Sequence, residues 1–300
     1  MTEPQRIDLE GQNGLRIAAD TIGDPSDPPV ILLHGGGQTR HSWHTTLRNL
    51  GTNGWYAVSI DLRGHGDSEW APGGDYSLAS FAADIAAIAQ RLPNPVLIGA
   101  SLGGSSSLAA IGLHGDAVDA SALVLVDIAP NIEIAGADRI RGFMREHMLT
   151  GFASLDEVAD AVQAYNPHRP RPSDLSGLKK NVRQRDDGRW YWHWDPQFMT
   201  LRPNEDEPRV SQHRNDLLEG AARSLTIPAL LVRGRQSDLL SMEGVQEFLA
   251  MAPHARFADV SGAGHMVAGD KNDAFNDAVV TFLDDVRSGT APHRGTATAE

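Results

Sequence analysis

The chain has 300 residues, of which 41% are hydrophobic and 22% charged; this is ordinary for a globular protein and excludes disordered, collagen-like and coiled-coil chains. It contains no cysteine, so disulfides, thiolate catalysis and cysteine-based zinc sites are excluded. The 26 basic and 39 acidic residues give a formal net charge of −13, which makes nucleic acid and anionic lipid poor general partners.

The first ten residues, MTEPQRIDLE, are polar and acidic where a signal peptide would need an apolar core. The longest apolar runs, at 30–33 and 122–126, are long enough for strands and too short to span a membrane. The segment 288–300 is small, polar and rich in turn residues, so we predict a disordered tail. From these features we expect a cytoplasmic protein with no membrane partner, either a monomer or a homodimer.

The first 130 residues alternate between predicted strands and helices. After an N-terminal hairpin around residues 11–14, short apolar runs predict strands buried on both faces, and apolar residues at helical spacing predict the helices between them. The predicted strands are 30–34, 55–62, 95–100 and 121–128, and the predicted helices are 42–50, 77–92 and 102–113. This alternation predicts a parallel sheet whose strands are joined by crossover helices.

The alternation stops between residues 130 and about 212, where no apolar strand is visible, and a structureless loop of that length is implausible in a compact domain. Three amphipathic helices are predicted there, at 138–150, 155–165 and 174–185, and an aromatic cluster follows at 189–196. Strands at 228–234 and 255–260 and helices at 242–251 and 272–286 then resume the alternation. We therefore predict an α/β core in two parts, 1–130 and 213–287, that carries a helical cap at 131–212.

Ser101 is the strongest candidate for a catalytic residue. It lies in Gly99-Ala-Ser101-Leu-Gly103, directly after a predicted strand and before a predicted helix. In such a turn the serine is held in a strained conformation, and small flanking residues let the strand and the helix pass closely. A serine in an ordinary tight turn is the alternative, but the strand-turn-helix context favours a nucleophile.

A nucleophilic serine needs a base, and His265 is the best placed of the 12 histidines. It lies in a glycine-rich loop after the last predicted strand, and that loop emerges at the same carboxyl edge of the sheet as Ser101. His34 and His65 precede the serine and are expected to bond local backbone groups. His41 and His44 have a spacing that can suit a metal, but no carboxylate accompanies them, so we expect neither a metal nor a cofactor.

Two acids follow predicted strands at that same edge, Asp238 after 228–234 and Asp127 at the end of 121–128. The chain order Ser101, Asp238, His265 is the order expected for this type of turn. We therefore predict Asp238 as the acid that orients His265, with Asp127 as the alternative.

Five motifs together resemble those of the α/β-hydrolase superfamily. They are Leu33-His-Gly-Gly-Gly37, Asp61-Leu-Arg-Gly-His-Gly-Asp-Ser68, Gly99-Ala-Ser101-Leu-Gly-Gly104, Arg233-Gly-Arg-Gln-Ser-Asp238 and Gly264-His265. The resemblance implies an eight-stranded, mostly parallel α/β sheet with helices on both faces and a cap inserted after the sixth strand. It also implies a Ser101–His265–Asp238 triad and an oxyanion hole made by the backbone N–H groups of Leu102 and Gly36, with Gly37 as the alternative to Gly36.

The residue at the nucleophile position narrows the chemistry that the resemblance implies. Haloalkane dehalogenases and epoxide hydrolases use aspartate where this chain has Ser101, so neither reaction is expected. The motifs are similar to those of serine esterases, which implies hydrolysis of a small or medium carboxylic ester and a small-molecule ester or lactone as the partner. A lactonase or a carbon–carbon-bond hydrolase with the same triad is an alternative, as is a low-turnover ligand-binding receptor. The cap is expected to set the choice of substrate.

Overall fold

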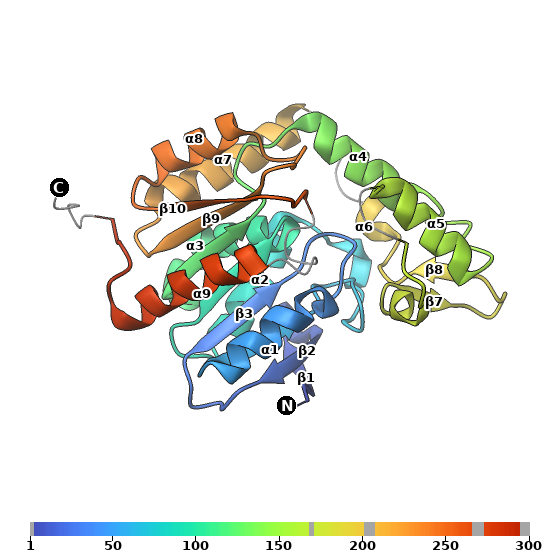
Figure 1. Cartoon of the computed structure of the whole chain (residues 1–300), viewed down its shortest axis with the longest axis horizontal. Coiled ribbons are helices and arrows are strands. Elements are labelled where there is room, and N and C mark those ends of the chain that lie inside the picture. Colours follow the sequence, from blue (N-terminus) through green and yellow to red (C-terminus); the bar gives the residue numbers. More distant parts are fainter. Residues whose placement is uncertain (1–2, 168–170, 201–207, 266–272, 295–300) are drawn as a thin grey trace.

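The computed structural model describes residues 3–167, 171–200, 208–265 and 273–294. Eight strands form one sheet in the order β1-β2-β4-β3-β5-β6-β9-β10 (Figure 1). They are β1 (Gln5–Glu10), β2 (Arg16–Ile22), β3 (Pro29–Leu33), β4 (Tyr56–Ile60), β5 (Val96–Ala100), β6 (Ala122–Val126), β9 (Ala229–Gly234) and β10 (Arg256–Val260). The pairs β1–β2 and β2–β4 are antiparallel, and all the other pairs are parallel. The predicted eight-stranded, mostly parallel sheet is therefore confirmed.

Helices cover both faces of this sheet. They are α1 (His44–Thr52), α2 (Leu78–Ala89), α3 (Leu102–Val118), α7 (Pro208–Ser224), α8 (Met242–Met251) and α9 (Asp273–Ser288). Successive side chains of a strand point to opposite faces, so in β3 Val30 and Leu32 belong to the apolar cluster that includes α1 and α9, whereas Ile31 and Leu33 belong to the cluster that includes the other four helices. A strand covered on both sides must be apolar throughout, which explains the continuous run at 30–33.

Between β6 and β9 the chain leaves the sheet and forms a separate group of elements beside it (Figure 1). This insertion contains α4 (Ile134–Arg145), α5 (Leu155–Tyr165), a hairpin of β7 (Val182–Gln184) and β8 (Trp190–Trp192), and α6 (Gln197–Thr200). The helix predicted at 155–165 has those bounds, and the one predicted at 138–150 is shifted toward the N-terminus as α4.

The helix predicted at 174–185 is wrong. A short 3₁₀ turn covers Ser176–Lys180, and the chain then extends to pair with β8. Val182 is almost fully buried on this hairpin. Pairing with the aromatic segment therefore outweighs the helical spacing of the apolar residues, as tertiary contacts often do for short segments.

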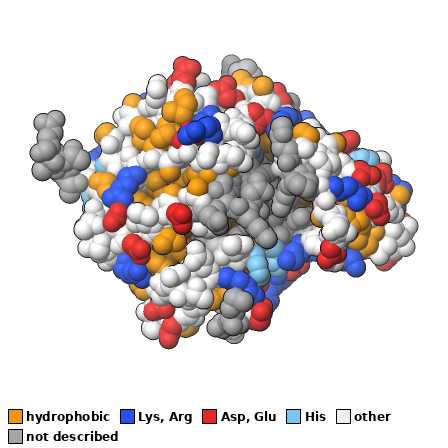
Figure 2. All heavy atoms as spheres, in the orientation of Figure 1, with side chains coloured by type: hydrophobic (Ala, Val, Ile, Leu, Met, Phe, Trp, Pro, Cys, Tyr) orange, Lys and Arg blue, Asp and Glu red, His pale blue; other side chains and the backbone are white. Residues whose placement is uncertain are grey.

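The predicted domain boundaries at 130, 212 and 287 stay predictions, although α7 already begins at Pro208. The predicted disordered tail is corrected in part. Ala291 is buried and the backbone N–H of Arg294 donates to Thr226 O, so residues 289–294 pack on the core, while residues 295–300 lie outside the described residues. In the part of the chain that the structure describes, no helix is long and apolar enough to cross a bilayer. Acidic and basic side chains are interspersed on the face shown in Figure 2.

Candidate active site

Ser101 occupies the sharp turn between β5 and α3. Its backbone has φ 46° and ψ −111°, a conformation that costs a non-glycine residue about 1–3 kcal/mol. The close passage of strand and helix explains the glycines around it. A Cβ at Gly99 would lie 2.5 Å from the carbonyl of Gly103, and a Cβ at Gly103 would lie 2.4 Å from Leu33 O. The turn thus has the strained, glycine-flanked geometry that its sequence predicts.

The structure brings His265 together with Asp127. The ring Nδ1–H of His265 donates to Asp127 Oδ2 at 2.7 Å. The Asp127 carboxylate is fully buried and accepts two further hydrogen bonds, from Gly234 N at 3.0 Å and from Ser237 Oγ at 2.5 Å. Because β6 is the neighbour of β5 in the sheet, Asp127 lies at the strand end next to the one that carries Ser101.

Asp238, the predicted acid, is not brought to His265. It forms an ion pair with Arg139 Nε of α4 at 3.0 Å, and both side chains are substantially exposed. The turn after β9 explains this placement. Ser237 points inward, donating to Asp127 and accepting from the backbone N–H groups of Leu239 and Leu240, so the next side chain faces outward.

The glycine loop (residues 35–37) after β3 lies against the nucleophile, since a Cβ at Gly35 would be 3.4 Å from Ser101 Cβ. Gly35 N donates to Gln38 Oε1 at 2.9 Å, and Gly37 N donates to His65 Nε2 at 3.1 Å. Among the described residues, the backbone N–H groups of Gly36 and Leu102 have no acceptor. Gly37 N–H is already bonded to His65, so Gly36 is a better candidate than Gly37 for an oxyanion donor.

His34 and His65 make the local backbone bonds that the sequence analysis expects. His34 donates through Nδ1 to Gly35 O at 2.7 Å and accepts from Leu62 N at Nε2, while His65 donates through Nδ1 to Arg63 O at 3.0 Å. Burial lowers the pKa of His34 to about 4. The His34 ring is therefore neutral at physiological pH.

Ser101 and His265 open into one cavity of about 1440 Å³ between the core and the insertion. Gly36 and Leu102 line it as well, so the serine, the histidine and the two unbonded N–H groups face a common space. The insertion contributes apolar side chains to the lining: Phe143, Met144, Trp192, Trp194, Phe198 and Met199. Two of these, Trp192 and Trp194, stack with ring centroids 4.9 Å apart.

The two histidines considered for a metal have other neighbours. His41 Nδ1 lies 3.6 Å from Asp20 Oδ2, and His44 Nε2 accepts from Arg48 Nε at 3.0 Å. Burial lowers the pKa of both rings, and nearby Arg40 and Arg48 add to this for His41 and His44 respectively. Over the described ranges, no three histidine or acidic side chains gather in a way that suits a metal ion.

The sequence favours Asp238 over Asp127 as the acid, and none of its motifs singles out Ser237 or His193, which also contact the site. Asp127 carries one local signal, since it directly ends the strand next to β5 in the sheet. Ser237 has no such signal in the sequence other than its position in the turn after β9. His193 comes from the insertion, and its role depends on how the insertion packs on the core.

Comparisons with known proteins agree with this architecture. Residues 28–271 match the model of a family described as the alpha/beta hydrolase fold. The chain is 31% identical over 271 residues to the esterase Rv0045c of Mycobacterium tuberculosis, covering 86% of this chain and 84% of the esterase. A solved structure of that esterase superposes with a TM-score of 0.72 at 28% identity, over 94% of this chain and 92% of the other. The 3-hydroxybutyrate-oligomer hydrolase of Cupriavidus necator is 27% identical over 259 residues, which are 83% of this chain and 87% of the hydrolase. The chain belongs to the α/β hydrolase fold family.

Proposed function

We propose that this protein is a serine hydrolase that cleaves small or medium carboxylic esters through an acyl-enzyme on Ser101. The observation that carries the proposal is the 2.7 Å hydrogen bond between buried Asp127 and His265, a histidine that lines the same cavity as the strained Ser101. Family membership supports a hydrolase. Two similar proteins, an esterase and a 3-hydroxybutyrate-oligomer hydrolase, support an ester as the substrate.

In this mechanism His265 Nε2 takes the proton of Ser101 Oγ while Oγ attacks the ester carbonyl carbon. The carbonyl oxygen becomes an oxyanion, which accepts hydrogen bonds from Gly36 N–H and Leu102 N–H. Imidazolium then returns the proton to the alkoxide as the carbon–oxygen bond breaks and the alcohol leaves. Water, deprotonated by the same histidine, attacks the acyl-enzyme, and the carboxylic acid is released as Ser101 regains its proton.

We propose Asp127 rather than Asp238 as the third member of the triad. A buried carboxylate that accepts from Nδ1–H keeps the proton off Nε2, so that Nε2 is available to the serine, and it stabilises the imidazolium that forms. Asp127 is fully buried and bonds His265, whereas Asp238 pairs with Arg139 in an exposed position.

The cavity supports a substrate with an apolar portion. Its volume of about 1440 Å³ exceeds the roughly 300–1,000 Å³ of ordinary small-molecule pockets. Phe143 and Met144 of α4 and the Trp192–Trp194 stack give it an apolar side contributed by the insertion. We therefore expect an acyl or alcohol group of medium size to pack on these residues.

A panel of nitrophenyl esters, lactones and vinylogous diketones, assayed with the wild-type protein and Ser101→Ala, tests the proposal. We expect the highest kcat/KM on esters with a medium acyl chain and a loss of at least about 10³-fold in the variant. Faster turnover of lactones or of diketones would instead identify a lactonase or a carbon–carbon-bond hydrolase that uses the same triad. Binding of these compounds with negligible kcat would identify a ligand-binding receptor and contradict the proposal.

A further inference from the structure

The glycine loop is held by three histidines, one for each of three successive peptide groups. His34 donates to Gly35 O, the carbonyl of the peptide that carries Gly36 N–H. His65 accepts from Gly37 N–H, the amide of the next peptide. His193 donates through Nε2 to Gly37 O at 3.2 Å, the carbonyl of the third peptide. Two of these histidines belong to the core, and His193 belongs to the insertion.

The first peptide shows how such bonds aim an oxyanion donor. In a trans peptide the C=O and the N–H point in opposite directions. Gly35 O accepts from His34 on one side and also from Gln38 N at 3.1 Å, so Gly36 N–H points the other way. Gly36 borders both Leu102 and the cavity. Gln38 N is the amide of the third peptide, whose carbonyl is Gly37 O, so a contact that holds this peptide also acts on Gly35 O and thereby on the direction of Gly36 N–H.

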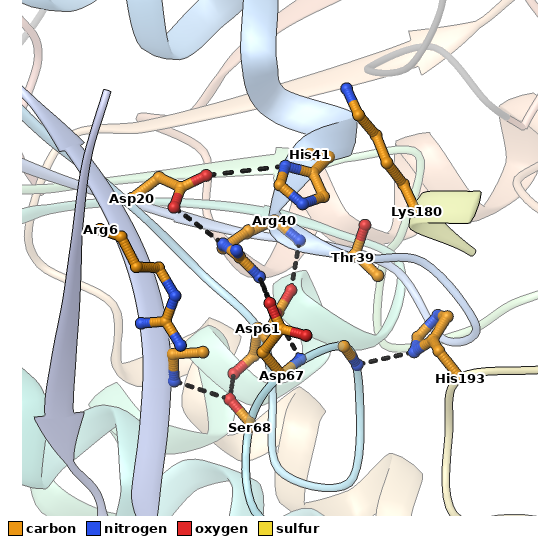
Figure 3. Close-up of polar contacts among 12 residues, drawn as sticks. Arg6, Asp20, Thr39, Arg40, His41, Asp61, Asp67, Ser68, Lys180 and His193 are labelled. Atoms are coloured by element: carbon orange, nitrogen blue, oxygen red, sulfur yellow. Dashed lines mark hydrogen bonds and ion pairs between the residues drawn. The ribbon is translucent and has the colours of Figure 1, made fainter. Parts of the chain in front are cut away.

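His193 joins this loop to a second core segment, the 61–69 loop between β4 and α2. Gly66 N donates to His193 Nδ1 at 2.6 Å, while His193 Nε2 donates to Gly37 O (Figure 3 shows His193 reaching the loop that carries Asp67). Since an amide N–H can only donate and a carbonyl can only accept, the two partners determine the tautomer. Both bonds need a neutral ring with the proton on Nε2.

The surroundings keep that ring neutral and oriented. His193 is 3% exposed, and its centroid lies 5.8 Å from that of His65. Burial, with the nearby His65 and His34, lowers the pKa of His193 well below its ordinary value. Its own backbone N donates to Asn181 O, directly before β7, at 3.2 Å, which ties the residue to the hairpin of the insertion.

Other contacts join the insertion to the same 61–69 loop without touching the glycine loop. Arg183 Nη2 of β7 pairs with Asp67 Oδ1 at 2.9 Å. Asp67 Oδ2 in turn pairs with Arg40 Nη1 at 2.9 Å, and Figure 3 shows these two residues side by side. The backbone N of Asp195 donates to Gly64 O, and Tyr76 Oη donates to the Asp195 carboxylate. Docking of the insertion therefore does not depend on His193 alone, which separates its contact with Gly37 from docking in general.

We infer that His193 is a positioning residue of the oxyanion hole: the insertion, through this imidazole, fixes the third peptide of the glycine loop and thereby the direction of Gly36 N–H. This inference rests on the proposed function. It makes the insertion a contributor to transition-state stabilisation in addition to its place in the cavity wall. The Gly37–Gln38 peptide is held at both ends, by Gln38 N donating to Gly35 O and by His193 donating to Gly37 O, and loss of the second bond leaves only the first to fix its orientation.

The test compares His193→Phe, His193→Gln and Arg183→Gln with the wild-type protein. Phenylalanine fills a similar volume without hydrogen-bonding groups, whereas glutamine offers one donor and one acceptor in roughly the imidazole arrangement. Arg183→Gln is the matched control, because it removes a contact between the insertion and the 61–69 loop and leaves Gly37 O bonded. Each variant is assayed on an oxygen ester and on the matching thionoester, whose C=S sulfur is a poor hydrogen-bond acceptor.

We expect His193→Phe to lower kcat on the oxygen ester by about 10- to 100-fold with KM nearly unchanged, because small misplacements of a catalytic donor have effects of that size. The thionoester, which gains little from the oxyanion hole, should lose much less, so the oxygen-to-sulfur rate ratio falls. His193→Gln should recover much of kcat on the oxygen ester and much of the oxygen-to-sulfur rate ratio. Arg183→Gln should keep the wild-type ratio. Thermal unfolding of each variant reports separately on stability.

If His193→Phe does not fold, His193→Asn takes its place, since its shorter amide cannot reach both partners and should lower the same ratio. A folded His193→Phe or His193→Asn with a wild-type kcat and rate ratio would overturn the inference. An equal loss in Arg183→Gln would also overturn it, by making docking in general the cause. Failure of the proposed function looks different: the wild-type protein would turn over no ester, or Ser101→Ala would stay active.

Discussion

Asp127 and Asp238 differ in what surrounds each carboxylate, and this difference separates their expected roles. Three donors converge on buried Asp127, from His265, Ser237 and Gly234, whereas Asp238 has one exposed arginine partner. A buried carboxylate with its hydrogen bonds made can orient an imidazole. An exposed ion pair contributes about 0–1 kcal/mol to stability and nothing to the geometry of the base.

We therefore expect Asp127→Asn to lower kcat by about 10²- to 10⁴-fold, because an amide at this position favours the wrong tautomer of His265. Asp238→Asn, which changes the same atoms on the other acid, should stay within about threefold of wild type. Steady-state kinetics of the two variants on one ester decide between the acids. A severe loss in Asp238→Asn together with a mild one in Asp127→Asn would reverse the assignment.

The residues of the site differ in how far the sequence alone identifies them. Ser101 and His265 stand in motifs whose chemistry depends on local backbone, and local backbone follows from the glycines around them. The choice between Asp127 and Asp238 depends on which side chain of one turn points inward, and no pattern in the sequence shows that Ser237 takes the inward position. His193 contacts the site only because the insertion docks, so its role follows from packing between distant segments.

Among the elements, the sheet was predictable because strands buried on both faces leave continuous apolar runs. The insertion was harder, since its segments are short and half-buried and different local structures can satisfy the same spacing. Residues 174–185 have a helical pattern, yet the pairing of β7 with β8 and the burial of Val182 make an extended segment more stable.

The contact between α3 and β3 gives a prediction at this scale. A Cβ at Gly103 would lie 2.4 Å from Leu33 O, so Gly103→Ala should force the helix away from the strand and cost about 1–3 kcal/mol of unfolding free energy. Gly115 of the same helix has open space around its Cα, and Gly115→Ala should stabilise by about 0.5–1 kcal/mol. Urea unfolding of the two variants measures both changes. Equal changes in unfolding free energy in Gly103→Ala and Gly115→Ala would contradict a close contact between Gly103 and Leu33 O.

For the whole molecule, the buried neutral histidines make stability depend on pH. The pKa of His34 is lowered to about 4 and that of His193 lies well below its ordinary value, both mainly through burial. Between about pH 6.5 and 4 the unfolded chain therefore binds more protons than the folded one, and the free energy of unfolding falls as pH falls. His34 should lower the free energy of unfolding by about 2 kcal/mol between pH 7 and pH 5, and His193 should lower it further in the same direction.

Urea unfolding at pH 7, 6 and 5 checks this dependence, and His193→Gln is its control, because glutamine does not titrate. The variant should lose less unfolding free energy than the wild-type protein over the same range, because only the contribution of His193 is removed. An unfolding free energy that stays flat from pH 7 to pH 5 would show that these histidines are not held neutral in the folded protein.

The central claim, a covalent intermediate on Ser101 formed with His265 as the base, is tested most directly by intact-protein and peptide mass spectrometry after treatment with a fluorophosphonate. We expect one adduct per chain, located on Ser101, with loss of ester hydrolysis in proportion to labelling. Ser101→Ala should show no adduct, and Asp127→Asn should label more slowly than Asp238→Asn. Full ester hydrolysis by a protein that carries no adduct on Ser101, or an adduct on another residue that tracks the loss of activity, would contradict the account.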